Sequence, residues 1–122
     1  MLDINIDLII DFRRRIVKEQ GISSIEYYMF EEHEMLRRAA TECICNLVIL
    51  DEVKEAFVGQ ENDRVKLLVL FCAEEEDVAL IKASSGALAV LSSDARCVEK
   101  ITKVLQSNNI CNYSIDSIQY RR

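Results

Sequence analysis

The chain has 122 residues, a length that fits one domain, and half of them are hydrophobic, which is enough for a packed core. Its net charge of −6 argues against a nucleic-acid partner, because such a partner selects a basic face. Proline is absent and glycine occurs only three times, so helices are favoured over a turn-rich β architecture.

The expected compartment is the cytoplasm, with no membrane partner. No apolar run reaches the roughly 18 residues that a membrane span needs, and the start of the sequence lacks the basic and apolar stretches of a secretory signal. In a reducing compartment the cysteines are expected to be free and largely buried. A single histidine and no paired cysteines in metal-ligand spacing give no basis for a metal or a cofactor. The five cysteines are Cys43, Cys45, Cys72, Cys97 and Cys111.

Three helices are expected in the first part of the chain. The first covers residues 4–20, with apolar residues on one face and basic residues in its later turns. Gly21 is expected to end it as a left-handed residue. A short helix over residues 25–30 follows, in which Tyr27, Tyr28 and Phe30 are either core or exposed. The acidic residues 31–34, with His33 as an exposed or capping residue, precede a third helix over residues 34–49.

The same order then recurs. Asp51 is expected to cap a helix that runs to Val58, and Gly59 is expected to end it. A second helix should reach residue 73, and a third should cover residues 77–92. Gly59 lies 21 residues before Leu80 and Gly21 lies 15 before Leu36, so the second helix is expected to be longer here by about a turn and a half. A further first helix is expected over residues 94–105.

A helical phrase occurs twice, at residues 36–47 and 80–91, with matching positions 44 residues apart. A period in the forties with small residues in mid-helix predicts an all-α, armadillo-like α-solenoid of two three-helix repeats plus a partial third. The solenoid is expected to span residues 1–105 and a weakly ordered tail residues 106–122. The larger core contacts are assigned to Leu36, Ile44 and Leu47. Residues expected to let neighbouring helices approach closely are Ala39, Ala40, Cys43, Ala83, Ser84, Gly86 and Ala87.

Residues 29–47, MFEEHEMLRRAATECICNL, resemble the UCS-domain myosin chaperones of animals, and so do residues 62–70, NDRVKLLVL. The similarity spans about residues 14–101 and implies a slice of the armadillo-like UCS solenoid. In that family a tetratricopeptide domain binds the ninety-kilodalton heat-shock chaperone and the UCS solenoid binds the myosin motor domain. Because this chain shows no tetratricopeptide segment, the myosin motor domain is the implied partner. Self-association through two open solenoid ends is also expected.

The candidate partner-binding groove consists of Arg38, Glu42, Asn46 and Lys82. The third helices of armadillo solenoids line the concave groove, and Asn46 matches an asparagine that can bond a partner's backbone there. It could instead cap or bridge neighbouring helices. Arg38 and Glu42, one turn apart, could contact a client or form a solvated pair within their helix.

The second candidate is the loop Asn62-Asp63-Arg64, which could cap the following helix or contact a client. The leading functional hypothesis is a non-enzymatic chaperone module for myosin motors. The alternatives are a generic armadillo adaptor that binds an extended peptide near Asn46, and thiol chemistry at Cys43, Cys45 or Cys72. The last lacks a partner base or a metal set in the sequence.

Overall fold

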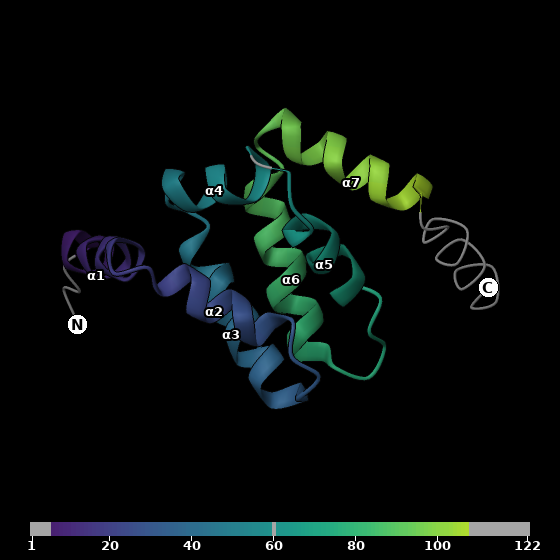
Figure 1. Ribbon diagram of the computed structural model, residues 1–122, viewed down its shortest axis with the longest axis horizontal. Coiled ribbons are helices and arrows are strands. Elements are labelled where there is room, and N and C mark those ends of the chain that lie inside the picture. Colours follow the sequence, from purple (N-terminus) through teal and green to yellow (C-terminus); the bar gives the residue numbers. More distant parts are fainter. Residues whose placement is uncertain (1–5, 60, 108–122) are drawn as a thin grey trace.

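A computed structural model describes residues 6–59 and 61–107, which form helices and connecting turns without a strand (Figure 1). The all-α fold predicted from the sequence is confirmed. The helices are α1 (Ile6–Lys18), α2 (Gly21–Met29), α3 (Glu34–Leu47), α4 (Asp51–Val58), α5 (Arg64–Phe71), α6 (Val78–Leu91) and α7 (Ala95–Ser107). The predicted tail, residues 106–122, lies outside the described residues apart from its first two positions.

The helices fall into two three-helix units and the first helix of a third, in the predicted order. α1–α3 form the first unit, α4–α6 the second, and α7 begins the next. The most extensive packing joins α3 to α6, the third helices of the two units, which run side by side through the middle of the molecule (Figure 1). α7 packs on α5 and α4, so the second unit is covered from both sides.

The left-handed residue between α1 and α2 is Gln20 (φ 63°, ψ 26°), not Gly21 as predicted. Gly21 begins α2, and a Cβ there would lie 2.6 Å from Ile16 Cγ2 and 2.8 Å from the Ile16 carbonyl oxygen. Glycine is therefore required at this corner for close approach to the preceding helix. The positive φ falls one residue earlier, where the side chain has room.

The second helix of the second unit is not longer, contrary to the prediction. α5 has 8 residues and α2 has 9. The additional residues of the second unit lie in the connections before Arg64 and after Phe71. The wider spacing between Gly59 and Leu80 is therefore taken up by connections and not by a longer helix.

Helix caps differ from one another in chemistry. The Asp77 side chain caps α6, with the Leu80 N–H donating to its Oδ1 at 3.0 Å. His33 caps α3, with the Leu36 N–H reaching its Nδ1 at 3.5 Å. The predicted cap at Asp51 is wrong: α4 begins there, and the cap position is Leu50, in extended conformation and without a side-chain bond.

The core lies between the two units and runs up to α7. Ile44, Phe57, Leu68 and Leu80 are fully buried at its centre, and burial of each side chain of this size stabilises the fold by about 1.5–3 kcal/mol. At the α3–α6 crossing a Cβ built on Gly86 would lie 3.1 Å from Cys45 Sγ. The predicted use of a small residue to bring these helices together is confirmed at this position.

Several residues predicted as buried are exposed in the first unit. Leu36 is 42% exposed, and Ala39 and Cys43 are exposed as well. Cys43, Cys45, Cys72 and Cys97 are free, and Cys97 is the buried one; Cys111 lies outside the described residues. Among the described residues no helix is long and apolar enough to cross a membrane.

Candidate functional site

An open groove of about 380 Å³ lies between α3 and α6. Its α3 side is formed by Glu42, Cys45 and Asn46, and its α6 side by Ala79, Lys82 and Ala83. The structure thus brings together Glu42, Asn46 and Lys82, three of the four residues predicted for a partner-binding groove. They meet because the 44-residue repeat places the third helices of successive units side by side.

Asn46 is exposed on the last turn of α3, at the edge of this groove. Among the hydrogen bonds of the described residues none involves its side chain, so it neither caps a helix nor bridges two of them there. The amide offers both a carbonyl acceptor and an NH₂ donor. This is the chemistry needed to bond an extended peptide backbone. Glu42 and Lys82 add one charge of each sign to the groove.

Arg38, the fourth predicted residue, has a different role. Its Nε donates to Asp77 Oδ1 at 2.9 Å and to Oδ2 at 3.0 Å, across the boundary between the units. The expected pair with Glu42 within α3 is therefore wrong. The hydrogen bond to Asp77 raises the pKa of Arg38, and the same bond from Arg38 holds the pKa of Asp77 below its usual value. Because Asp77 also caps α6, this contact fixes α3 against the start of α6.

The predicted loop Asn62-Asp63-Arg64 lies apart from the groove and bonds to its own surroundings. Asn62 Oδ1 accepts from the Arg64 N–H at 2.9 Å, and Asn62 Nδ2 donates to the Ala56 carbonyl at 3.0 Å. The side chain of Asp63 makes no capping bond. Asn62 therefore shapes the turn into α5.

Arg64 links three helices. Its Nη1 donates to the Ala56 carbonyl at 2.6 Å, and its Nε lies 2.8 Å from Glu26 Oε2 on α2. The guanidinium also stacks over the Phe57 ring, 5.9 Å from its centroid. These contacts tie α5 to α2 and α4, and they account for the arginine without a bound client.

Sequence reasoning missed two features. One is an open hollow of about 580 Å³ beside α2, lined by Ser23, Glu26, Tyr27, Phe30, Glu31, Glu32 and Arg64. Tyr27, Tyr28 and Phe30 are exposed there or nearby, which settles their placement outside the core. The spacing of Glu26 and Arg64 along the chain gave no hint that they would meet.

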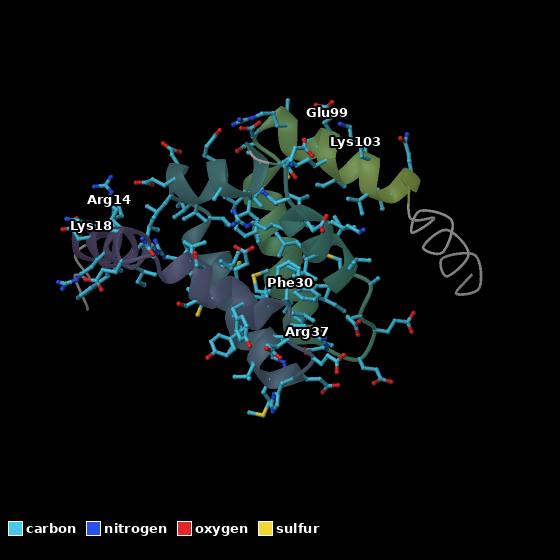
Figure 2. The ribbon with its side chains drawn as sticks, viewed as in Figure 1. Arg14, Lys18, Phe30, Arg37, Glu99 and Lys103 are labelled. Carbon is cyan, nitrogen blue, oxygen red and sulfur yellow. The ribbon has the colours of Figure 1, made fainter. Side chains whose placement is uncertain are left out.

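The other is an ion-pair network at the start of α7. Arg96 Nη2 lies 2.7 Å from Asp94 Oδ2 and 2.8 Å from Glu55 Oε2, so it joins α7 to α4. The hydrogen bond from Arg96 lowers the pKa of Asp94 to about 2 and also lowers the pKa of Glu55. The network is exposed and belongs to the stacking of successive first helices. Figure 2 shows Glu99 and Lys103 further along α7, far from Phe30 and Arg37 at the α2–α3 end.

No protein-family model matches the chain, whereas individual proteins do. Protein unc-45 homolog B of Xenopus laevis is 50% identical over 93 residues, which cover 75% of this chain and 10% of that protein. The human protein of the same name is 42% identical over 116 residues, covering 89% of this chain and 12% of that protein. The chain therefore spans about a tenth of the length of these relatives.

Two solved structures have the same fold. UNC-45 from Drosophila melanogaster matches with a TM-score of 0.68 and 45% identity over 78% of this chain and 13% of that chain. The second is a structure of the UNC-45 chaperone, and its description names molecular features critical for binding and folding muscle myosin. It matches with a TM-score of 0.72 and 38% identity. That match covers 78% of this chain and 11% of the other.

Proposed function

We propose that this chain, which is related to the UNC-45 chaperones by sequence and by fold, is a non-enzymatic module that binds the myosin motor domain and assists its folding. The observation that carries the proposal is the match to a structure of the UNC-45 chaperone, whose description concerns features of that chaperone critical for binding and folding muscle myosin. At a TM-score of 0.72 and 38% identity, the described helices have the arrangement of a segment of that chaperone.

The proposed binding site is the α3–α6 groove. Asn46 would bond the backbone of an extended client segment, and Glu42 and Lys82 would select polar neighbours of either charge. Ala79 and Ala83 keep the floor shallow, so the client backbone can approach. Such a site holds a segment without chemistry, as expected of a chaperone that shields a folding intermediate from aggregation.

The decisive assay is the heat-induced aggregation of a purified myosin motor domain, followed by light scattering. We expect the chain to suppress scattering at stoichiometric amounts and to co-sediment with the motor. The variant Asn46→Ala combined with Lys82→Glu should lose most of this effect while its helical circular dichroism is unchanged. Glu99→Gln is the matched control, because Glu99 is exposed on α7, away from the groove (Figure 2). If the unmodified chain neither binds nor protects the motor, the proposal is wrong.

A second candidate is an armadillo adaptor that binds an extended peptide in the same groove. The exposed Asn46 amide, without a bond among the described residues, is the observation that favours it. Short unfolded peptides would then bind as well as the folded motor does, and Asn46→Ala would weaken both. A chaperone should instead prefer the heated motor over any short peptide. A titration of both ligands by fluorescence anisotropy separates the two functions.

We place this activity in the cytoplasm. We assign no contact with the ninety-kilodalton heat-shock chaperone to the solenoid itself, because in the resembling family that contact belongs to a tetratricopeptide domain. A pull-down of that chaperone with the chain alone should therefore be negative. A positive result would mean that the solenoid itself contacts the heat-shock chaperone.

A further inference from the structure

The hollow beside α2 combines exposed aromatic rings with carboxylates. Its volume is about 580 Å³, and its α2 side carries Ser23, Glu26, Tyr27 and Phe30. Tyr27 is 62% exposed and Phe30 is 52% exposed, although phenylalanine is among the residues most often buried. Apolar residues scattered singly over a surface are common, whereas two exposed rings that line one concave surface mark a candidate interaction site.

The hollow faces the second unit and lies apart from the α3–α6 groove. Arg64, the first residue of α5, lines it and lies 2.8 Å from Glu26 Oε2 through its Nε. Among the described residues none lines both the hollow and the groove. The hollow is therefore a surface between two units that are both present in this chain, and not a face on which a further repeat would stack.

The hollow carries a net negative charge. Its lining includes the carboxylates of Glu26, Glu31 and Glu32 against the one guanidinium of Arg64. Arg64 pairs with Glu26, whereas among the described residues no ion pair reaches Glu31 or Glu32. The hydroxyl of Tyr27 donates to Glu31, and this hydrogen bond raises the pKa of Tyr27. A cation that enters the hollow would thus meet two carboxylates without a cationic partner, next to an aromatic ring.

The chain itself shows how rings and carboxylates hold an arginine. The Arg64 guanidinium lies over the Phe57 ring, 5.9 Å from its centroid, and beside the Glu26 carboxylate. The Arg37 guanidinium lies 5.6 Å from the centroid of the Phe71 ring. A planar guanidinium suits such places better than an ammonium, because it can stack on a ring and bond a carboxylate at the same time. The hollow offers the same two groups to solvent.

We propose that the hollow beside α2 binds an arginine side chain of a partner protein, held by the rings of Tyr27 and Phe30 and by the carboxylates next to them. The occupant is basic because an acidic or neutral segment would cover Glu31 and Glu32 without compensating their charge. The inference does not rest on the proposed function, since the hollow and the groove have separate residues.

A fluorescein-labelled hexapeptide with three arginines tests the proposal when it is titrated against the full chain by anisotropy at low salt. One counterpart carries lysine in place of arginine, and the other carries citrulline, which keeps the shape of arginine without its charge. We expect the arginine peptide to bind at least tenfold more tightly than the citrulline peptide and at least twofold more tightly than the lysine peptide. Changes in amide NMR shifts should be concentrated at residues 23–32 and at Arg64.

Variants of the chain separate the site from general attraction. Glu31→Gln combined with Glu32→Gln should weaken binding of the arginine peptide at least fivefold. The matched control is Glu74→Gln combined with Glu76→Gln, which removes two exposed carboxylates before α6 and should weaken binding less than twofold. Phe30→Leu keeps an apolar side chain but removes the ring, and it should weaken binding at least threefold. Because these side chains lie at the surface, the helical circular dichroism should not change.

The proposal is overturned if the citrulline peptide binds as tightly as the arginine peptide, and equal binding of the lysine peptide would overturn the choice of arginine. It also fails if the control pair at positions 74 and 76 weakens binding as much as the pair at 31 and 32, because the attraction would then come from the net charge of −6. Asn46→Ala, in the groove, should leave binding of the arginine peptide unchanged. A loss with Asn46→Ala would place the peptide in the groove and contradict the assignment, whatever the outcome of the myosin assay.

Discussion

The two units of this solenoid contain the same helical phrase in different surroundings. In the second unit, Leu80, Ala83 and Ala87 of α6 are buried, and Ser84 and Leu91 are buried as well. In the first unit, α3 buries Ala40, Ile44 and Leu47 but leaves Leu36 exposed. The repeated sequence therefore specifies a helix with two faces that can pack. Whether a given face is buried depends on whether a neighbouring helix lies on it. The difference between the units can be measured.

The largest effect is expected from the pair Leu80→Ala and Leu36→Ala. Leu80 is fully buried, so its truncation leaves a cavity and should lower the free energy of unfolding by about 2–5 kcal/mol. Leu36 is 42% exposed and should cost well under half as much. Urea unfolding monitored by circular dichroism measures both. Equal losses would mean that the Leu36 side chain is covered in solution.

Gly86 and Glu42 form a second pair, since they occupy equivalent positions in the two third helices. Gly86→Val forces a branched side chain against Cys45 Sγ and should destabilise the chain by about 1–3 kcal/mol. Glu42→Val, on an exposed position, should change stability by less than about 0.5 kcal/mol. The double variant Gly86→Val with Cys45→Ala should recover part of the loss. Without such recovery, the cost of Gly86→Val would not arise at the α3–α6 crossing.

Much of this architecture could be predicted from the sequence, because the repeat and the amphipathic pattern are local properties. α4 ends at Val58 as predicted, and α3 and α6 end within two residues of their predicted ends. Glu42, Asn46 and Lys82 were placed in one groove because the repeat fixes which helices neighbour each other. Composition alone could not assign the positive φ to Gln20 rather than Gly21, since the two residues are adjacent where α2 begins.

What could not be predicted depends on contacts between units. The Arg38–Asp77 pair joins residues 39 positions apart, and Glu42, one turn away, was the nearer acid in the sequence. The exposure of Cys43 and Leu36 depends on which neighbour is present, which a helical pattern does not state. The absence of a longer second helix followed from loop lengths, which vary freely among repeats.

A smaller difference in stability is expected between the N-caps of α6 and α3, Asp77 and His33. Asp77→Ala removes the α6 cap and the partner of Arg38 together, and we expect a loss of about 1 kcal/mol from the cap alone. His33→Ala should cost less, because its bond to the Leu36 N–H is long, at 3.5 Å, and no cation binds it among the described residues. Thermal melts at neutral pH rank the two. A greater loss for His33→Ala would contradict the assignment of Asp77 as the contact that joins the units.

The smallest effect is expected at the α4–α7 contact, where Arg96 bonds Asp94 and Glu55 on the surface. The pKa of Asp94 is about 2 in the folded chain against an ordinary value of 3.8. A carboxyl with a depressed folded pKa contributes stability that is complete above its unfolded pKa and is lost as the pH falls through the folded value. The contribution should therefore be present above about pH 4 and disappear towards pH 2. Because the network is exposed, salt should weaken it.

Arg96→Gln isolates this contribution, because it removes the cation while leaving both carboxylates in place. The variant should melt slightly below the unmodified chain at pH 6 in low salt, and the two should converge as the pH falls towards 2 or as salt is raised. Lys103→Gln, which breaks only the 3.8 Å pair with Glu99 within α7, is the control and should show no convergence of comparable size. If the difference in melting temperature between Arg96→Gln and the unmodified chain were the same at every pH, the effect would arise from packing of the aliphatic part of Arg96. The ion pairs would then not stabilise the contact between α4 and α7.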